Sequence, residues 1–192
     1  MQFLSAERRN PFGMSPPCDP GVHGGTGTGV PFTGKPWSER FFRTLERGDL
    51  VRNVDLDRRE IVHGRTFFSY LHMCVPDHAP TADDYAAMEP FFDAELRAIT
   101  AHILLPVGSR ATAAVLDTYT ARPSTDLDVD ALHGSELRGS GWLVVPIKDP
   151  SEWSDGDAER LVDGLLELQS TDYRRLSDLG RFFPDDDPYL VR

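Results

Sequence analysis

The sequence predicts an α/β fold in which a short parallel sheet is covered by helices on both faces. Three apolar runs have the length of strands and are separated by segments with helical periodicity: 65–74, 102–108 and 141–147. Strands that are apolar along their whole length must be buried on both faces, which favours parallel pairing with crossover helices. We expect a single domain over residues 1–192, with an N-terminal loop segment at 1–18 and a C-terminal extension at 170–192.

Caps and apolar stripes predict the helices that cover the sheet. Pro36 suits the first turn of a helix that runs to about Gly48, and Ser109 is expected to cap a helix at 110–117. Ser154 with Asp157 marks the start of a later helix. The stripes of the first and the last of these helices are Trp37, Phe41 and Leu45, and Leu161, Leu165 and Leu168.

A further helix is predicted from Thr81 to about Ala101. Thr81 caps it, acidic residues follow in its first turn, and Pro90 in its middle is expected to kink or split it. Its expected core residues are Tyr85, Met88, Phe92 and Ile99. The segment 121–140 is interpreted as a long acidic connection, and 172–180 predicts a last short helix.

The stretch "GTGVPFTGKPW" (27–37) is close to a phosphate-binding loop. Gly29, Gly34 and Lys35 fit the pattern G-x-x-x-x-G-K, but Pro36 stands where a hydroxyl must hold Mg²⁺. Such a loop also follows a buried strand, and the preceding residues contain no run of four apolar residues. A nucleotide-binding protein is therefore the interpretation that we rank last.

The charge balance is strongly acidic. The net charge is −11, with 21 Asp and 10 Glu against 18 Arg and two lysines, Lys35 and Lys148. Such a surface keeps a protein hydrated in concentrated salt, so we expect a halophilic source; an ordinary acidic cytosolic protein is the alternative. Acidity normally argues against nucleic-acid binding, but counter-ion release contributes little in molar salt, where shape, stacking and a few arginines would have to suffice.

Cysteine content and hydropathy indicate the compartment. Cys18 and Cys74 cannot form a disulfide framework, which suggests a reducing environment. The apolar runs are far shorter than a membrane span, and the N-terminus lacks the hydrophobic stretch of a signal peptide. We expect a cytoplasmic monomer with no membrane partner.

In a sheet of this kind, the ligand lies beyond the carboxyl ends of the strands. That rule selects the loops 19–34, 74–80, 108–109 and 148–154. Their sequences include "DPGVHGGTGTGVPFTG", "CVPDHAPTADDYAAMEPFFDAELRAITAHILLPVGSRATAAVL" and "VPIKDPSEW". In order and spacing these blocks resemble the uracil-DNA glycosylase superfamily, most closely its family-four branch, and the acidic composition suggests a divergent haloarchaeal member.

The resemblance, which covers about residues 19–168, implies a three-layer α/β/α sandwich and cleavage of the bond between a damaged base and deoxyribose. The base is swung out of the duplex into a pocket. Phe32 would stack on it, while Gly21 and Val22 would supply backbone amides and position water. Tyr70 stands where the family has the Asn that reads the uracil edge, so it could donate only one hydrogen bond and uracil selectivity is in doubt.

The catalytic positions also depart from the family pattern. Asp149 stands where the family has a histidine that stabilises the departing base, and it could instead activate water or stabilise the sugar cation. The alternative is a loop aspartate that caps its own backbone. His23 lies one residue before the family's acid, whose position is Gly24; it could orient water, but a solvated loop histidine is slightly favoured.

The resemblance assigns a DNA-binding surface as well. Ser109, Lys148 and Ser151 would lie near the DNA backbone. Trp153 would fill the gap left by the flipped nucleotide as an apolar wedge, or alternatively pack on the last helix. DNA is therefore the expected partner.

Two family features are not matched. The family-four branch binds an iron–sulfur cluster through four cysteines, and this chain has only Cys18 and Cys74, so we expect no cofactor. Cys74 with His72 and His78 could bind a metal, but packing explains their spacing better. Family members also have an apolar strand directly before the first glycine loop, and this chain has too few residues there to form it. Either the sheet lacks this strand, or "MQFLS" takes its place.

The sequence thus predicts a glycosylase of base-excision repair that hydrolyses the N-glycosidic bond of uracil or another deaminated base. The alternative is a non-catalytic nucleic-acid-binding relative that keeps the pocket but lacks the family's Asn and His.

Overall fold

The computed structural model describes residues 2–3, 24–25, 28–56, 60–63, 66–72, 81–99, 101, 103–125, 127–139 and 142–170. The predictions for Gly21, Val22 and His23, for both cysteines, for His78 and for the helix at 172–180 lie outside the described residues. None of the helices within these ranges combines the length and the hydropathy needed to cross a membrane.

A five-stranded sheet forms the centre of the molecule, in the order β4-β1-β5-β7-β6. The strands are β1 (Gln2–Phe3), β4 (Thr66–Phe67), β5 (Ile103–Leu104), β6 (Leu137–Gly139) and β7 (Trp142–Val144). Strands β4, β1, β5 and β7 are parallel, and β6 runs antiparallel to β7 at the edge. The prediction of parallel pairing is confirmed for four strands. The interpretation of 121–140 as a connection was wrong for β6, whose three residues form no apolar run that would predict a strand.

The N-terminal residues take the place of the strand that the sequence lacked. Gln2 pairs with Thr66 on one side and with Ile103 on the other, and Phe3 pairs with Phe67 and Leu104. Of the two expected outcomes, the one in which this N-terminal stretch supplies the strand is observed for Gln2–Phe3.

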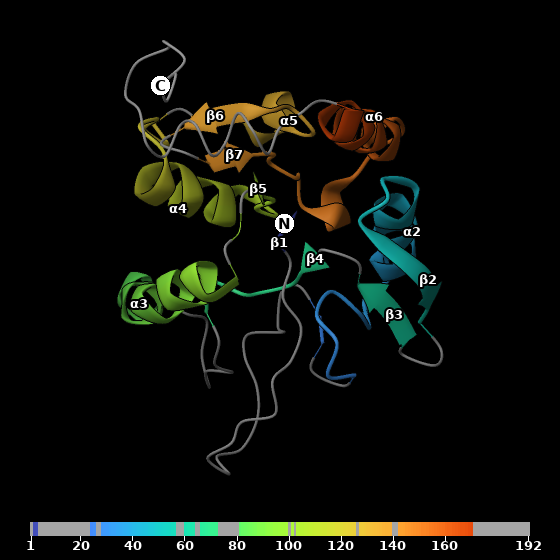
Figure 1. Ribbon diagram of the computed structural model, residues 1–192, viewed down its shortest axis with the longest axis horizontal. Helices are drawn as coiled ribbons and strands as arrows, with labels where there is room; N and C mark the ends of the chain where they lie inside the picture. The colour runs from blue at the N-terminus through green and yellow to red at the C-terminus, as the bar shows by residue number, and fades with distance from the viewer. Residues whose placement is uncertain are drawn as a thin grey trace, which may run out of the picture.

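Alternating side chains on the strands divide the core into two layers. Ile103, Leu143 and Val145 belong to a cluster with α2 (Ser38–Arg47) and α6 (Asp157–Ser170). Leu104 and Val144 belong to a second cluster with α3 (Ala82–Ile99) and α4 (Ser109–Tyr119). Figure 1 shows the sheet edge-on between these two helix pairs. Because successive strand residues point to opposite faces, the predicted three-layer α/β/α arrangement is confirmed.

Prolines shorten the strands but do not separate them. The regular pairing of β5 and β7 ends before Pro106 and Pro146, which have no N–H to donate. Beyond them, the amide of Ile147 donates to the Pro106 carbonyl at 2.8 Å and that of Gly108 to the Ile147 carbonyl at 2.7 Å. These bonds keep the two loops side by side at the carboxyl edge of the sheet.

Two of the three predicted N-terminal helix caps are observed. The amide of Thr81 donates to Asp84 while the Thr81 hydroxyl accepts from the Asp84 amide, and the amide of Ser154 donates to Asp157. Ser109 is not a cap, because it is the first residue of α4 and Gly108, with a φ of 84°, precedes it. Helix α3 runs unbroken through Pro90, so the split that was one of two expected outcomes is not observed.

Besides β6, four elements had no counterpart in the sequence prediction. The antiparallel hairpin of β2 (Val51–Asp55) and β3 (Glu60–His63) packs beside α2, as Figure 1 shows. The single-turn helix α5 (Val129–Leu132) and the 3₁₀ helix η1 (Pro150–Glu152) are too short for periodicity to reveal them.

Candidate functional site

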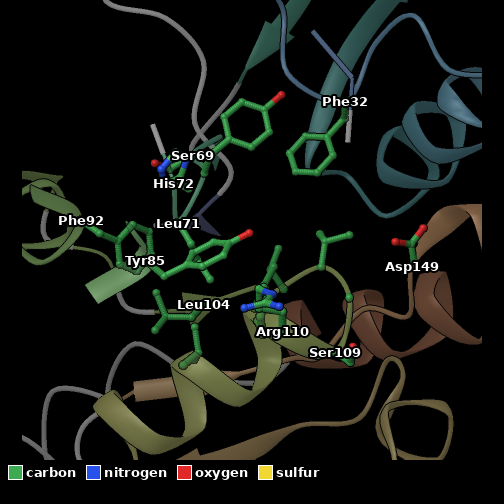
Figure 2. Close-up of a pocket in the computed structure, with 17 residues that line it drawn as sticks. Phe32, Ser69, Leu71, His72, Tyr85, Phe92, Leu104, Ser109, Arg110 and Asp149 are labelled. Atoms are coloured by element: carbon green, nitrogen blue, oxygen red, sulfur yellow. The ribbon is translucent and has the colours of Figure 1, made fainter. Parts of the chain in front are cut away.

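A cavity of about 260 Å³ opens at the carboxyl ends of β4 and β5. Its lining includes Phe32, Tyr70, Val107, Ser109 and Asp149, which come from segments far apart in the sequence (Figure 2). The volume is many times the roughly 30 Å³ of a liquid water molecule and just below the roughly 300 Å³ at which drug-sized pockets begin. It therefore suits a group of the size of one nucleobase.

Phe32 forms one wall of this cavity. It has a φ of 63° and is only 3 % exposed. Its ring lies 5.3 Å from that of Phe41 and 6.0 Å from that of Phe68, measured between centroids. The aromatic core thus holds the ring in one orientation at the edge of the cavity.

The turn that carries Phe32 uses its amides internally. Thr28 and Gly29 donate to the Gly25 carbonyl, Gly25 donates to the Thr33 carbonyl, and Thr33 donates to Val30. A phosphate-binding loop directs such amides at its ligand. This hydrogen bonding is that of a compact turn and does not fit a phosphate cradle.

Tyr70 stacks against Phe32 and forms a hydrogen bond with the backbone of Gly24. Its ring lies 5.7 Å from that of Phe32 at 28°, and its hydroxyl donates to the Gly24 carbonyl at 2.7 Å. Gly24 has a φ of 84°, and a Cβ there would lie 2.2 Å from the Thr33 carbonyl oxygen. Position 24, which the resemblance assigned to an acid, therefore admits only glycine in this chain.

Asp149 lines the cavity and also caps its own loop. Its Oδ1 accepts from the Ser151 amide at 2.9 Å and from the Ser151 hydroxyl at 2.6 Å, at the start of η1. The Asp149 side chain therefore does cap its own loop in the structure. The carboxylate nevertheless borders the cavity, so the two interpretations do not exclude each other.

The sequence profile of the uracil DNA glycosylase superfamily matches residues 18–164, which is more than half of the chain. The chain belongs to the uracil-DNA glycosylase superfamily. No curated protein matches it. Membership indicates a glycosylase-like function on DNA and agrees with the α/β fold. The matched range contains every cavity residue named above.

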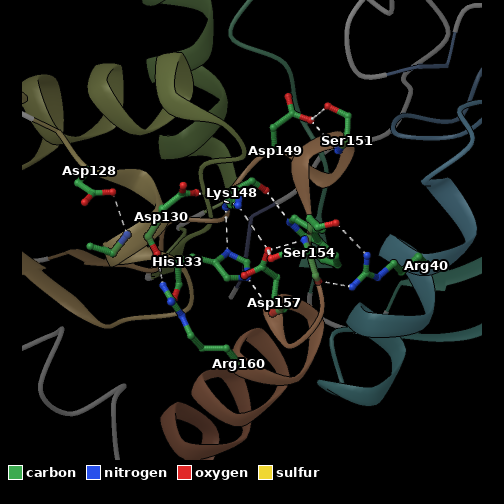
Figure 3. A network of polar contacts seen from close by, with 12 residues as sticks. Arg40, Asp128, Asp130, His133, Lys148, Asp149, Ser151, Ser154, Asp157 and Arg160 are labelled. Carbon is green, nitrogen blue, oxygen red and sulfur yellow. Dashed lines mark hydrogen bonds and ion pairs between the residues drawn. The ribbon is translucent and has the colours of Figure 1, made fainter.

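A partly buried polar network begins at Lys148, the residue before Asp149 (Figure 3). The ammonium of Lys148, whose side chain is 15 % exposed, lies 3.1 Å from Asp130 and 3.5 Å from Asp157. The hydrogen bond that the Lys148 ammonium donates to the Asp130 carboxylate is the main cause that raises the pKa of Lys148. Because two carboxylates already neutralise this charge, the geometry does not favour the predicted DNA contact of Lys148.

His133 is the centre of the network and was not singled out from the sequence. It is 1 % exposed, its Nδ1 accepts from the Lys148 amide at 2.9 Å, and its Nε2 lies 2.9 Å from the Asp157 carbonyl oxygen. These partners require the neutral Nε2–H tautomer. Burial is the main cause that lowers the pKa of His133 below its ordinary value of 6.5.

Trp153 packs in the interior of this glycosylase-family fold. It is 8 % exposed, its Nε1 donates to the Lys148 carbonyl at 2.9 Å, and its ring meets that of Phe41 edge-on at 5.9 Å. The Arg40 guanidinium lies 5.6 Å from the ring centroid. A ring so enclosed cannot enter a duplex without leaving the core, which favours packing, the alternative role, over the wedge. Ser151 is exposed on η1, and Ser109 is exposed at the cavity.

Sequence reasoning missed three residues on the opposite wall of the cavity. The Arg110 guanidinium lies 4.7 Å from the centroid of the Tyr85 ring, which meets the His72 ring at 5.6 Å. His72 had been weighed only as a metal ligand. Within the described ranges, no three His, Cys, Asp or Glu side chains are grouped to hold a metal.

Proposed function

We propose that this member of the superfamily hydrolyses the N-glycosidic bond of uracil or another deaminated base that is flipped out of DNA, as a step of base-excision repair. The observation that supports this most directly is the cavity of about 260 Å³, which has the Phe32 ring in one wall and Asp149 on its border. A cytoplasmic monomer without a bound cofactor remains the expected form.

The Phe32 ring would stack on the flipped base. Extrusion of a nucleotide costs a few kcal/mol of stacking and pairing, and an aromatic face in the pocket returns part of it. Because Phe41 and Phe68 hold the ring in place, little side-chain entropy is lost when the base arrives.

Asp149 would act on the sugar side of the reaction. The bond between C1′ and the base nitrogen breaks, its electron pair leaves with the base, and the oxygen of water bonds to C1′. A carboxylate next to the cationic sugar stabilises it and accepts a proton from the attacking water; the base takes up a proton as it leaves. The bonds from Ser151 to Oδ1 would fix the orientation of the carboxylate during this step.

The second candidate is a nucleic-acid-binding protein without catalysis. It is favoured by the internal hydrogen bonds of two substituted positions, because Tyr70 donates to Gly24 and Asp149 accepts from Ser151. In this case the cavity would hold a base and the bond would stay intact.

Two variants of Asp149 separate these candidates. Asp149→Asn keeps an oxygen for the Ser151 donors but removes the charge, whereas Asp149→Ala removes both. The assay offers single- and double-stranded oligonucleotides with uracil, hypoxanthine or xanthine in high salt and measures alkali-labile abasic sites. If the charge is catalytic, both variants lose about 10²- to 10⁴-fold in rate, while Ser151→Ala, which keeps the carboxylate, loses far less. Retained DNA binding without cleavage of any base by the wild type would establish the binder instead.

A further inference from the structure

An arginine without a carboxylate partner among the described residues lies on the wall of the cavity. Arg110, the second residue of α4, is exposed there, and of the described lining residues it is the one arginine or lysine and Asp149 the one carboxylate. Every other arginine in the described ranges except Arg122 pairs with a carboxylate or donates to a backbone carbonyl. In a chain with a net charge of −11, a cation left in this state at a cavity is available to a ligand.

The Tyr85 ring holds this guanidinium at the cavity. The Arg110 Cζ lies 4.7 Å from the centroid of the Tyr85 ring, and the His72 ring meets Tyr85 edge-on at 5.6 Å. A contact with the face of a ring attracts the cation but occupies none of its N–H groups with an acceptor. In Figure 2 the guanidinium lies among the lining side chains, with Tyr85 on one side and Asp149 on the other. The N–H groups of Arg110 therefore remain donors for a ligand in the cavity.

Cleavage of an N-glycosidic bond separates charge in a way that the two charged side chains match. As the bond between C1′ and the base nitrogen breaks, the sugar becomes cationic, and the electron pair that leaves with the base is delocalised onto its carbonyl oxygens. Asp149 can stabilise the sugar but would repel the base. A donor placed at the oxygen on which negative charge develops stabilises the transition state, and most strongly where water is excluded. Arg110 is the described lining residue that carries the required charge.

We propose that the Arg110 guanidinium donates a hydrogen bond to a carbonyl oxygen of the flipped base and stabilises the negative charge that develops on the base as it leaves. This inference rests on the proposed function and deepens it, because it names the group that assists departure of the base. The guanidinium keeps its protons: the base takes up its proton from solvent, and the attacking water gives its own to Asp149. A guanidinium stays charged at any pH at which the protein is folded, so the contact needs no particular protonation state.

Arg110→Gln and Arg122→Gln form a matched pair of variants. Each removes an exposed guanidinium that has no carboxylate partner among the described residues, but only Arg110 lines the cavity. With uracil-containing DNA, we expect the single-turnover rate of base release to fall about 10²- to 10³-fold for Arg110→Gln, the loss typical of removing one donor to a developing anion. Arg122→Gln should leave it unchanged. Arg110→Lys keeps the charge but not the planar fork, so it should lose less than Arg110→Gln.

The identity of the leaving base tests the charge itself. Fluorine withdraws electrons and makes 5-fluorouracil a better leaving group than uracil, so its departure depends less on a neighbouring cation. The rate loss of Arg110→Gln should therefore be several-fold smaller with 5-fluorouracil-containing DNA than with uracil-containing DNA. A general structural defect would lower both rates by the same factor, so equal losses with the two bases overturn the proposal.

A phosphate contact is the other role that an arginine at this place could have, and DNA binding distinguishes it. DNA with a tetrahydrofuran abasic analogue has the backbone but no base. If Arg110 acts on the base, Arg110→Gln should bind this DNA as tightly as Arg122→Gln does. A selective loss of affinity for the abasic analogue in Arg110→Gln would make the residue a backbone contact and overturn the proposal.

Binding of the free bases separates failure of this inference from failure of the proposed function. At mildly alkaline pH, 5-fluorouracil is largely ionised and uracil is largely neutral. We expect the wild type to bind free 5-fluorouracil roughly tenfold more tightly than uracil, or better, and Arg110→Gln to lose this preference. An active wild type whose rate Arg110→Gln leaves unchanged overturns the role of Arg110 alone. A wild type that cleaves no base but shows the preference overturns hydrolysis and supports Arg110 as the residue that binds the anionic base. A wild type that neither cleaves nor shows the preference overturns both.

Discussion

The rings of Phe32 and Tyr70 lie 5.7 Å apart at an interplanar angle of 28°, and the Tyr70 hydroxyl donates to the Gly24 carbonyl at 2.7 Å. One side chain thus supports the cavity wall and ties down the loop before it. Because Gly24 is buried, its carbonyl depends on a protein donor, and Tyr70 supplies one.

Replacing Tyr70 by Phe should therefore weaken the fold while keeping the stacked ring. We expect the free energy of unfolding to fall by about 1–3 kcal/mol, the cost of leaving a buried acceptor unpaired. Urea titration at constant salt measures it. Tyr119→Phe removes a hydroxyl that has no partner in the described part of the chain, so it should not destabilise. Equal losses in both variants would mean that the Gly24 bond contributes nothing specific.

Phe32 and Phe41 provide a matched pair for the role of the cavity wall. Both are buried in the same cluster, but only Phe32 lines the cavity. Replacement of either by Leu should lower stability by a similar amount, roughly 1–2 kcal/mol. Stacking on a base is worth about 1–3 kcal/mol, so Phe32→Leu should lower kcat/KM by about 5- to 150-fold and Phe41→Leu far less. Comparable activities of the two variants would remove Phe32 from the site.

The halophilic character remains a prediction from composition, and stability in salt tests it. The 31 acidic side chains stand against 20 basic ones, so repulsion should be strong at low ionic strength. Simple screening is nearly complete at about 1 M salt, where the Debye length is about 3 Å. A halophilic protein should continue to gain stability between 1 and 3 M KCl, measured as the urea midpoint. A maximum at low salt would contradict the prediction.

The sequence predicted the layers and the cavity edge better than the individual roles of residues. Apolar runs and caps located β5, β7, α2, α3 and α6 because these depend on local periodicity. Strand β6 and the β2–β3 hairpin were not predicted, because their strands pair locally but contain few apolar residues and form no apolar run. The motif order singled out Phe32, Tyr70 and Asp149, which the fold brings to one cavity; their roles remain predictions.

The surroundings of Lys148 and Trp153 depend on contacts that a sequence does not show. Lys148 was read as a DNA contact, but Asp130 and Asp157 reach its ammonium from distant segments. Trp153 was read as a wedge, but Phe41 and Arg40 enclose it. Burial and pairing across the fold, which determine both cases, are tertiary properties.

His133 should make stability depend on pH in a defined window. Burial and the donated Lys148 amide keep the imidazole neutral, so its folded pKa lies below the ordinary 6.5. Below pH 6.5 the unfolded chain binds the proton more readily, and the free energy of unfolding should fall as pH drops from 7 toward 5, by up to about 1.4 kcal/mol per pH unit. His133→Asn offers an oxygen to the same amide but does not titrate, so urea titrations across this range should show a flatter profile for the variant. Parallel profiles would mean that groups other than His133 cause the loss of stability. Asp157 is not such a group: its folded pKa is lowered, so its contribution to stability is lost only at more acidic pH, around and below its ordinary pKa of 3.8.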